Sequence, residues 1–408
     1  MNCRFCKNPL TDLFIDLGNS PPSNSFVTKE YLNHGEMFYP LKIYVCDKCF
    51  LVQIDEYKKS ADIFNNFYPY FSSYSSTWLE HAKNYVEYII KRFPFNERSN
   101  VVEIASNDGY LLQFFKKQNI PVMGIEPTAN TAEIALAKGI HTIIDFFNEK
   151  LAHKLASENK KADLIIGNNV LAHVPDLNDF VKGLKVLLKP DGIITTELPH
   201  LMQLIEQSQF DTIYHEHFSY FSFYTVNTIF KNHQLELFDV QQLPTHGGSL
   251  RIFAKHIENK KIEITANVKL LMDQEIKLGM LDLKYYKNFE TKILKVKYDL
   301  IRFLIDQHDQ GKKIIAYGAA AKGNTLLNYC GIKADLIKFA VDASPFKQGK
   351  YMPASHIPIL NEENIRLHKP DFVLILPWNI KDEIIMQLSY IKEWGGKFVV
   401  PIPKLNII

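Results

Sequence analysis

Residues 101–109 read Val-Val-Glu-Ile-Ala-Ser-Asn-Asp-Gly, and this stretch decides the fold that we expect for the chain. Its first five residues are mostly apolar and β-branched and predict a buried strand, while the last four predict a tight turn. Residues 110–117 predict the start of a helix. A strand, a turn and a helix in this order form the first half of a parallel β-α unit.

The same alternation continues along the chain. We expect strands at 122–126, 141–147, 162–168 and 192–198, and helices at 78–92, 129–138 and 177–188, where apolar residues recur every three or four positions. Repeated β-α units predict an α/β fold with a doubly wound parallel sheet.

Polar residues follow three of these strands. They are the turn at 106–109, Glu126 and Asp145, and ligands of such sheets bind at the carboxyl ends of the strands. Glu126 lies 19 residues after Asn107, a spacing at which a carboxylate can bind a ribose diol. The turn lacks the G-x-G-x-x-G pattern that holds a pyrophosphate, so S-adenosylmethionine (SAM) is favoured over a nicotinamide dinucleotide. Asn168, Asn169 and His173 are expected to face the sulfonium.

Four cysteines near the N-terminus form two knuckles, Cys3-x-x-Cys6 and Cys46-x-x-Cys49. Two such pairs predict a tetrahedral zinc site, although the 39 residues between them exceed the common spacing of about 15 to 20. Four thiolates leave no open position, so the zinc would be structural. The alternative is four unrelated buried cysteines.

The densest group of chemically active side chains is Tyr214-His215-Glu216-His217. Imidazole and carboxylate can take a proton near neutral pH, and a phenol can stabilise a developing oxyanion. The alternatives are a polar surface turn and part of a metal site, because His-x-His can chelate.

The C-terminal part restarts the α/β pattern after a charged helical connector. Strands are expected at 313–317, 337–341, 372–376 and 397–400, and residues 318–325 predict a small-residue loop before a helix. With Lys322 this loop could bind a phosphate, or it could serve strand–helix packing alone. Trp378 and Asn379 follow a strand, where ligands also bind.

Composition sets the broad class. The 408 residues are 46% hydrophobic and 23% charged with a net charge of +2, as in ordinary globular proteins of two or three domains. Neither charge sign dominates, which argues against a dedicated nucleic-acid or membrane-surface binder. With no apolar leader or span, we expect a cytoplasmic protein. The aromatic cluster at 68–74 predicts a pocket or core packing.

The sequence resembles the sugar C-methyltransferases that act on nucleotide-linked 4-keto-deoxy sugars. The matching blocks run in family order through the whole chain: Cys3-x-x-Cys6, Cys46-x-x-Cys49, Ser106-Asn107-Asp108-Gly109, Gly124-Ile125-Glu126-Pro127, Asn168-Asn169-Val170-Leu171-Ala172-His173-Val174-Pro175, Tyr214-His215-Glu216-His217, His246-Gly247-Gly248 and Tyr317-Gly318-Ala319-Ala320-Ala321-Lys322.

The resemblance implies a small zinc-binding lobe (1–75), a central Rossmann-like class I methyltransferase domain (76–255), a helical connector (256–305) and a C-terminal Rossmann-like α/β domain for the nucleotide sugar (306–408). It implies a cytoplasmic monomer that uses SAM and structural zinc and has no nucleic-acid or membrane partner. In the zinc lobe, the metal ligands would be Cys3, Cys6, Cys46 and Cys49.

The resemblance also assigns roles at the active site. His217 would be the base, with Glu216, Tyr214, His173 and either Tyr68 or, preferably, Tyr70 beside the sugar. The cofactor residues would be Glu103, Ser106, Asn107, Asp108, Gly109, Glu126, Pro127, Asp145, Phe146, Asn168 and Asn169. The further substrate residues would be Tyr68, Ser72, Ser73, His200, His246, Lys322, Asn324 and Trp378.

The reaction implied is removal of a proton next to the C4 ketone, at C3 in most of the family, and methylation of the enolate. One alternative keeps the fold and changes the outcome to epimerisation or O-methylation. An alternative of another class is a zinc-ribbon protein that serves as a non-catalytic interaction scaffold.

Overall fold

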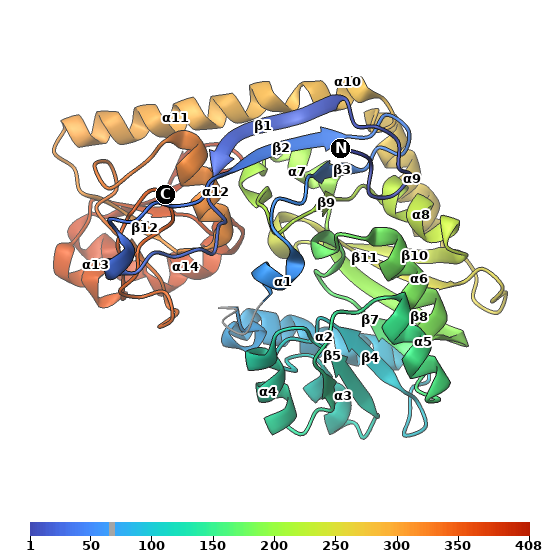
Figure 1. The fold of residues 1–408 in the computed structure, drawn as a ribbon. Helices are drawn as coiled ribbons and strands as arrows, with labels where there is room; N and C mark the ends of the chain where they lie inside the picture. The colour runs from blue at the N-terminus through green and yellow to red at the C-terminus, as the bar shows by residue number, and fades with distance from the viewer. Residues whose placement is uncertain (65–69) are drawn as a thin grey trace.

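The computed structural model describes residues 1–64 and 70–408 and forms three sheets (Figure 1). The expected organisation, a zinc-type N-terminal lobe, a central Rossmann-like domain and a C-terminal α/β domain, is confirmed. The long helix α11 (Phe289–Asp309) runs along one side of the molecule, from the C-terminal domain to the N-terminal sheet (Figure 1).

The N-terminal sheet is antiparallel, in the order β1-β2-β3-β9. Its strands are β1 (Asp12–Ser20), β2 (Tyr39–Val45), β3 (Val52–Ile54) and β9 (Ser219–Tyr220), accompanied by η1 (Lys29–Tyr31) and α1 (Ser60–Ile63). β9 directly follows the Tyr-His-Glu-His block and pairs with β3. The N-terminal lobe is therefore joined to the catalytic segment by main-chain hydrogen bonds.

The central sheet has the order β10-β11-β8-β7-β4-β5-β6, in which β4 to β8 run parallel and β11 runs antiparallel to its neighbours. Its strands are β4 (Val101–Ile104), β5 (Val122–Ile125), β6 (Thr142–Ile143), β7 (Ala162–Ile166), β8 (Leu188–Pro199), β10 (Leu235–Leu243) and β11 (Ser249–His256). Its helices are α2 (Ser76–Arg92), α3 (Leu112–Lys117), α4 (Ala129–Ala137), α5 (Glu149–Ser157), α6 (Leu177–Leu187) and α8 (Phe223–Asn232).

The strand predicted at 141–147 is much shorter in the structure. Only Thr142 and Ile143 pair with β5, at the edge of the sheet. Ile144 is half exposed, and the Asp145 side chain accepts a hydrogen bond from the Phe146 amide, which turns the chain away from the sheet. Asp145 thus lies in a loop beyond the strand.

The C-terminal sheet has the order β14-β13-β12-β15-β16-β17. Its strands are β12 (Ile314–Tyr317), β13 (Ala340–Val341), β14 (Ile359–Leu360), β15 (Phe372–Ile375), β16 (Lys397–Val400) and β17 (Asn406–Ile407), with α12 (Ala321–Cys330), α13 (Glu363–His368), η6 (Trp378–Ile380), α14 (Lys381–Gln387) and η7 (Ser389–Trp394). α12 begins at Ala321, five residues before the helix predicted from 326, so the predicted small-residue loop already contains the first helical turn. Lys322 therefore lies in its first turn.

The predicted connector consists of α9 (Ala266–Leu278), α10 (Leu283–Lys287) and α11, which extends beyond residue 305. One apolar core joins the N-terminal sheet, α11 and the C-terminal domain, and Phe14 of β1 stacks on Phe289 with 4.8 Å between ring centroids. Cys330 is buried in this core.

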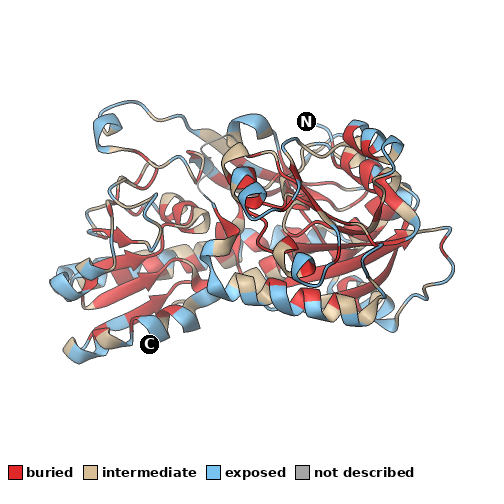
Figure 2. Ribbon diagram, turned by 90° about the horizontal axis from the view of Figure 1, so that it is seen from below, coloured by how far each residue is buried: buried red, intermediate tan, exposed pale blue. Residues whose placement is uncertain are grey.

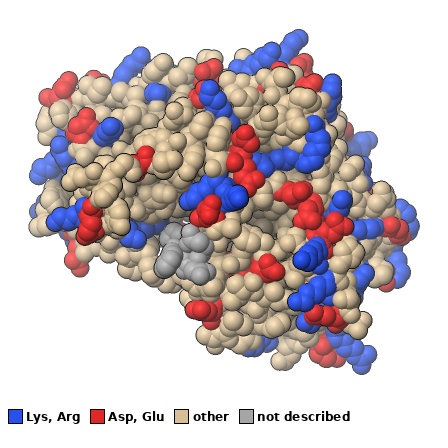
Figure 3. All heavy atoms as spheres, viewed as in Figure 1, with Lys and Arg blue, Asp and Glu red and all other residues tan. Residues whose placement is uncertain are grey.

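Burial follows the layers. The strands are largely buried, and helices on the outside bury one face and expose the other (Figure 2). Acidic and basic side chains are interspersed over the face shown in Figure 3, in keeping with the small net charge. Within the described residues, none of the helices combines the length and the apolar character that crossing a membrane requires.

Candidate active site

His217 lies in the turn between η4 (Phe210–Thr212) and β9. Its Nδ1 is 3.0 Å from the Thr212 carbonyl oxygen, and its Nε2 is 2.9 Å from the Tyr214 hydroxyl. Because a carbonyl only accepts, Nδ1 carries the proton and Nε2 presents the lone pair. Burial, and then the nearby His173, hold the pKa of His217 well below its usual range. The ring is therefore neutral and able to accept a proton at Nε2.

His173 closes η3 (Leu171–His173) and faces His217, with 4.7 Å between the ring centroids. Its Nδ1 donates to the main-chain carbonyl of Glu216 over 2.7 Å. Burial lowers the pKa of His173 to about 4, so this ring is also neutral near pH 7. The structure thus brings together two neutral imidazoles from distant parts of the sequence.

Glu216 and Tyr214 belong to the same group. The Glu216 carboxyl is buried and accepts a 2.7 Å hydrogen bond from the Asn24 side chain. Burial raises the pKa of Glu216 to about 7 and raises that of Tyr214 well above its usual range. His215, by contrast, points toward the N-terminal lobe, where its Nε2 donates to the Pro40 carbonyl.

Sequence reasoning missed Tyr220. It is buried, its ring centroid is 6.1 Å from that of His217, and its hydroxyl has no hydrogen-bond partner among the described residues. Its neighbours in the sequence, which include Phe218 and Phe221, gave no signal that it belongs to a functional site. Of the two tyrosines considered for the sugar, Tyr68 lies outside the described residues, while Tyr70 is half exposed and its carbonyl accepts from the Asn107 side chain.

The predicted cofactor residues meet at the carboxyl ends of β4 and β5. The Glu126 carboxylate accepts hydrogen bonds from the amides of Asn107 and Thr128, both at 2.9 Å. Several buried oxygens nearby have no partner within the described part of the chain: Glu103 Oε2, Ser106 Oγ, Asp108 Oδ1 and Asn168 Oδ1. Acceptors in excess of donors fit a ligand that carries an amino group and a positive charge, as SAM does.

Other residues assigned to cofactor or sugar support this turn. Ser72 and Ser73, predicted at the substrate, donate their amides to Asn107 Oδ1 and Asp108 Oδ2, at 2.9 and 3.2 Å. Gly109 has φ +75°, and a Cβ there would lie 2.6 Å from Ile140 Cδ1, so packing requires this glycine. Pro127 and Phe146 are half-buried at the ends of β5 and β6, and Asp145 is exposed.

The C-terminal domain contributes Lys322 and Trp378. The Lys322 ammonium donates to Asn379 Oδ1 over 2.7 Å and lies 4.8 Å from the Trp378 ring centroid. Trp378 Nε1 donates over 2.7 Å to Asp211, a fully buried carboxylate that sequence reasoning missed. Burial raises the pKa of Asp211 to about 6 and lowers that of Lys322. Asn324 instead donates to the Ser23 carbonyl, 2.6 Å away.

His246 is the remaining predicted residue in the part of the site around Lys322 and Trp378. Its Nε2 accepts from the Asn169 side chain at 3.3 Å, and its ring packs against Trp78, 5.2 Å between centroids. Burial, and then Lys322, lower the pKa of His246 to about 4. Asn169 has a positive φ of 54°, and its amide donates to the Glu197 carbonyl. His246 and Asn169 thus connect the predicted cofactor edge to the Gly-Gly turn.

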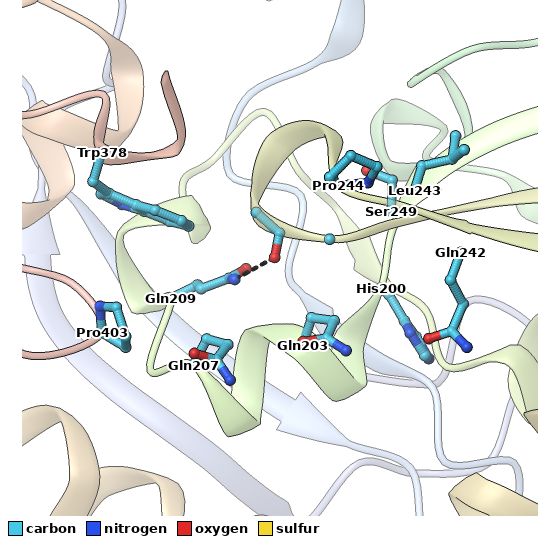
Figure 4. A pocket seen from close by; sticks show the side chains of 12 residues that line it. His200, Gln203, Gln207, Gln209, Gln242, Leu243, Pro244, Ser249, Trp378 and Pro403 are labelled. Carbon is cyan, nitrogen blue, oxygen red and sulfur yellow. Dashed lines mark hydrogen bonds between the residues drawn. The ribbon is translucent and has the colours of Figure 1, made fainter. Parts of the chain in front are cut away.

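His200 lies apart from this group. Its Nε2 is 2.6 Å from the buried carboxylate of Glu275, and its ring lines a pocket of about 410 Å³. Figure 4 shows this pocket, with Gln203, Gln207 and Gln209 on one side and Pro244 and Ser249 on the other; Gly247 and Gly248 also line it. Gln209 donates to the Gly247 carbonyl over 2.6 Å.

The four predicted metal ligands converge, with all sulfurs within 4.8 Å of one another and the pairs Cys3–Cys49 and Cys6–Cys46 at 3.5 Å. A tetrahedral zinc with Zn–S bonds of about 2.3 Å needs sulfur–sulfur distances of about 3.8 Å, so the cluster fits the ion. Within the knuckle, Arg4 donates to the Pro175 carbonyl at 3.0 Å and lies over Phe218, which places the predicted zinc site next to the segments that carry His173 and His217.

Comparisons with known proteins follow the same division. The family model described as "Putative zinc binding domain" matches residues 3–64, "Methyltransferase domain" matches 78–240, and "C-methyltransferase C-terminal domain" matches 244–403. The chain is 32% identical over 406 residues to the C-methyltransferase NovU of Streptomyces niveus, covering 100% of this chain and 96% of NovU. The chain belongs to the C-methyltransferase family.

More distant relatives match shorter stretches of this C-methyltransferase. A ubiquinone biosynthesis O-methyltransferase of Pasteurella multocida is 30% identical over 105 residues, which is 23% of this chain and 43% of that protein. The solved structure of magnesium protoporphyrin IX methyltransferase from Synechocystis PCC 6803 with bound SAM covers 43% of this chain and 78% of that chain, with 12% identity and a TM-score of 0.34.

The C-methyltransferase is therefore a SAM-dependent enzyme with a structural zinc site, and both cofactor predictions are confirmed. Glu126 and the 106–109 turn, which the sequence analysis predicted for SAM, lie together at the carboxyl ends of β4 and β5. The non-catalytic scaffold considered from the sequence does not account for a full-length match to a methyltransferase.

Proposed function

We propose that this enzyme methylates a carbon next to the C4 ketone of a nucleotide-linked 4-keto-6-deoxy sugar, at C3. The observation that carries the proposal is the neutral, half-buried His217, whose Nε2 lone pair accepts a hydrogen bond from the Tyr214 hydroxyl and lies beside His173 and Tyr220. Carbon methylation needs a base for a C–H bond, and that bond is acidic enough only where the electron pair can move onto a carbonyl oxygen.

His217 takes the proton from the sugar carbon onto Nε2, and the C–H electron pair becomes the carbon–carbon double bond of an enolate. The imidazolium that forms is stabilised by the Nδ1–H bond to Thr212 and by the enolate charge beside it. The Tyr214 and Tyr220 hydroxyls are the donors for the enolate oxygen. Bound SAM would supply an electrophilic methyl group to the enolate carbon: the sulfonium–methyl bond would break with its electron pair left on sulfur, a neutral thioether would leave, and the C4 ketone would re-form. His217 then returns its proton to solvent.

The nucleotide part of the substrate needs cations and main-chain donors. Lys322 in the first turn of α12 supplies both a charge and a helix N-terminus, and burial of the ammonium next to Trp378 strengthens its attraction for a diphosphate. Gly318, with φ +88° and no room for a Cβ beside Pro377, lets the chain turn sharply before the helix. These features support a diphosphate site on the C-terminal domain, with His246 on the sugar side.

The test is incubation of the enzyme with SAM and a panel of nucleotide 4-keto-6-deoxy sugars in deuterated water, followed by mass spectrometry and proton NMR. We expect a carbon-bound methyl group at C3. Deuterium at that carbon without a methyl group would mean epimerisation, and a methyl group on oxygen would refute the proposal.

His217→Asn tests the base directly. We expect a loss of about 10²- to 10⁴-fold in both deuterium exchange and methylation, the contribution typical of a general base, with SAM affinity unchanged. His153→Asn, an exposed histidine of α5, is the matched control. If His217→Asn exchanged deuterium at the wild-type rate, another residue would be the base.

A further inference from the structure

Glu216 is held from a part of the chain 192 residues away. Asn24 Nδ2 donates to Glu216 Oε1 over 2.7 Å, and Glu216, which directly precedes His217 in the chain, is buried. Asn24 belongs to the segment 21–27, which leaves the N-terminal lobe after β1. Among the described residues, Asn24 is the hydrogen-bond donor to this carboxylate.

We propose that Asn24 is a positioning residue of the active site, which orients Glu216 and, through the Glu216 main chain, the adjoining base His217. The inference rests on the proposed function of His217. It gives the N-terminal lobe a second task besides binding zinc, because this lobe then helps to fix the position of the base.

The segment that carries Asn24 is fixed on the C-terminal domain. The Ser23 carbonyl accepts a 2.6 Å hydrogen bond from the Asn324 side chain, and Val27 pairs with Tyr351 through main-chain hydrogen bonds of 3.0 and 2.8 Å. Asn324 is buried on α12, two residues after Lys322. Asn24 therefore reaches Glu216 from a backbone anchored on both sides, so its amide holds a defined direction.

Both ends of Glu216 are then constrained. Its main-chain carbonyl accepts the His173 Nδ1–H bond, and its side chain accepts the Asn24 bond. Because His217 is the next residue, a shift of Glu216 would change the distance between the two imidazoles. Asn24 thus fixes the geometry of the base as well as the carboxylate.

The charges around Glu216 make an amide donor the suitable partner. Lys58 attracts the carboxylate from the loop after β3, while Tyr214 and the His173 ring are neutral at neutral pH. A buried carboxylate without a donor would take up a proton. A hydrogen bond to a charged group contributes roughly 1.5–3 kcal/mol, which corresponds to a factor of about 10 to 150.

Asn24→Asp tests the proposal, because it keeps the size of the side chain and replaces the donor by a second carboxyl. At high pH the two carboxylates repel, and at lower pH they can share one proton, which restores the hydrogen bond. At pH 8 we expect the kcat of Asn24→Asp to be roughly 10- to 100-fold below that of the wild type. At pH 6 its kcat should lie within about 3-fold of the wild-type value. Zinc content and SAM affinity should not change.

Asn19→Asp is the matched control, since Asn19 is an exposed residue of the same lobe. The ratio of the kcat of Asn19→Asp to the wild-type kcat should be close to one at both pH values. A loss in Asn24→Asp that is the same at pH 6 and pH 8 would overturn the proposal, because a purely structural role predicts it. No loss at either pH would overturn it as well.

A measurement without sugar separates this inference from the proposed function. In ¹³C NMR titrations of the Glu216 carboxyl, assigned with Glu216→Gln, Asn24→Ala should raise the Glu216 pKa, because the donor that favours the ionised form is lost. If the pKa rises while no keto sugar is methylated, the contact stands and the proposed substrate fails. An unchanged pKa would refute the role of Asn24 whatever the substrate.

Discussion

Replacement of Trp378 by Phe isolates one buried hydrogen bond between the C-terminal domain and the catalytic segment. Trp378 Nε1 donates to Asp211 Oδ2 over 2.7 Å, and the other oxygen of this fully buried carboxylate has no partner among the described residues. Phenylalanine retains an aromatic face for the Lys322 ammonium, which lies 4.8 Å from the ring centroid. The main loss is therefore the N–H donor.

The magnitude follows from the charge on Asp211. A hydrogen bond to a charged group contributes roughly 1.5–3 kcal/mol, and its loss would raise the pKa of Asp211 from about 6 to about 7 or 8. The folded-state pKa already exceeds the ordinary value of 3.8, so the wild-type stability due to this group falls as pH rises from about 4 to 6. In Trp378→Phe that fall continues to about pH 8.

The assay is urea unfolding by circular dichroism at several pH values. Below pH 5, where Asp211 is protonated in both folded proteins, the variant should lose only packing energy, and above pH 8 the loss should be larger by about 1.5–3 kcal/mol. Trp394→Phe is the matched control, because Trp394 Nε1 donates to the uncharged Pro370 carbonyl. An equal loss for Trp378→Phe at every pH would refute the reasoning.

Two further predictions concern the catalytic hydroxyl and the metal. Tyr214→Phe removes the hydroxyl that lies 2.9 Å from His217 Nε2, and with it one hydrogen-bond donor for the enolate. We therefore expect kcat to fall roughly 10²-fold while the affinity for SAM stays unchanged. A variant with full activity would exclude this role of Tyr214. Cys46→Ser should lower the zinc content. Because Arg4 of the first knuckle contacts Pro175 and Phe218, the variant should also be cleaved faster by proteases near these two residues. A metal-free variant with wild-type stability and cleavage would refute the zinc assignment.

Local features of the structure were accessible from the sequence. The strand and turn at 101–109 and the helix at 78–92 depend on neighbouring residues, and the structure confirms them as β4 and α2. Cysteine spacing likewise predicted a cluster that the structure brings together. The helix predicted from residue 326 started too late, because Gly323, Asn324 and Thr325 have low helix propensity, yet they lie in the first turns of α12.

Contacts between distant segments could not be predicted in this way. Asn24 and Glu216 are 192 residues apart, and Asp211 and Trp378 are 167 apart, so no periodicity or spacing connects them. Gly109 illustrates the same limit. The sequence predicted the turn at Gly109. This position must lack a side chain because Ile140, from another segment of the chain, packs closely against it, which is a consequence of tertiary packing.

The need to exclude water gives a reason why the active site draws on every domain. An enolate carbon that meets water is protonated and the methyl transfer is lost, so carbon methylation requires a dry cavity more than oxygen methylation does. In the proposed mechanism, the turn before β9 supplies the base His217, while the N-terminal lobe holds Glu216 through Asn24 and the C-terminal domain donates to Asp211 through Trp378. Because these contacts join segments from different domains, opening the cavity would break buried hydrogen bonds to charged groups. The same bonds that orient the base therefore also oppose the entry of water.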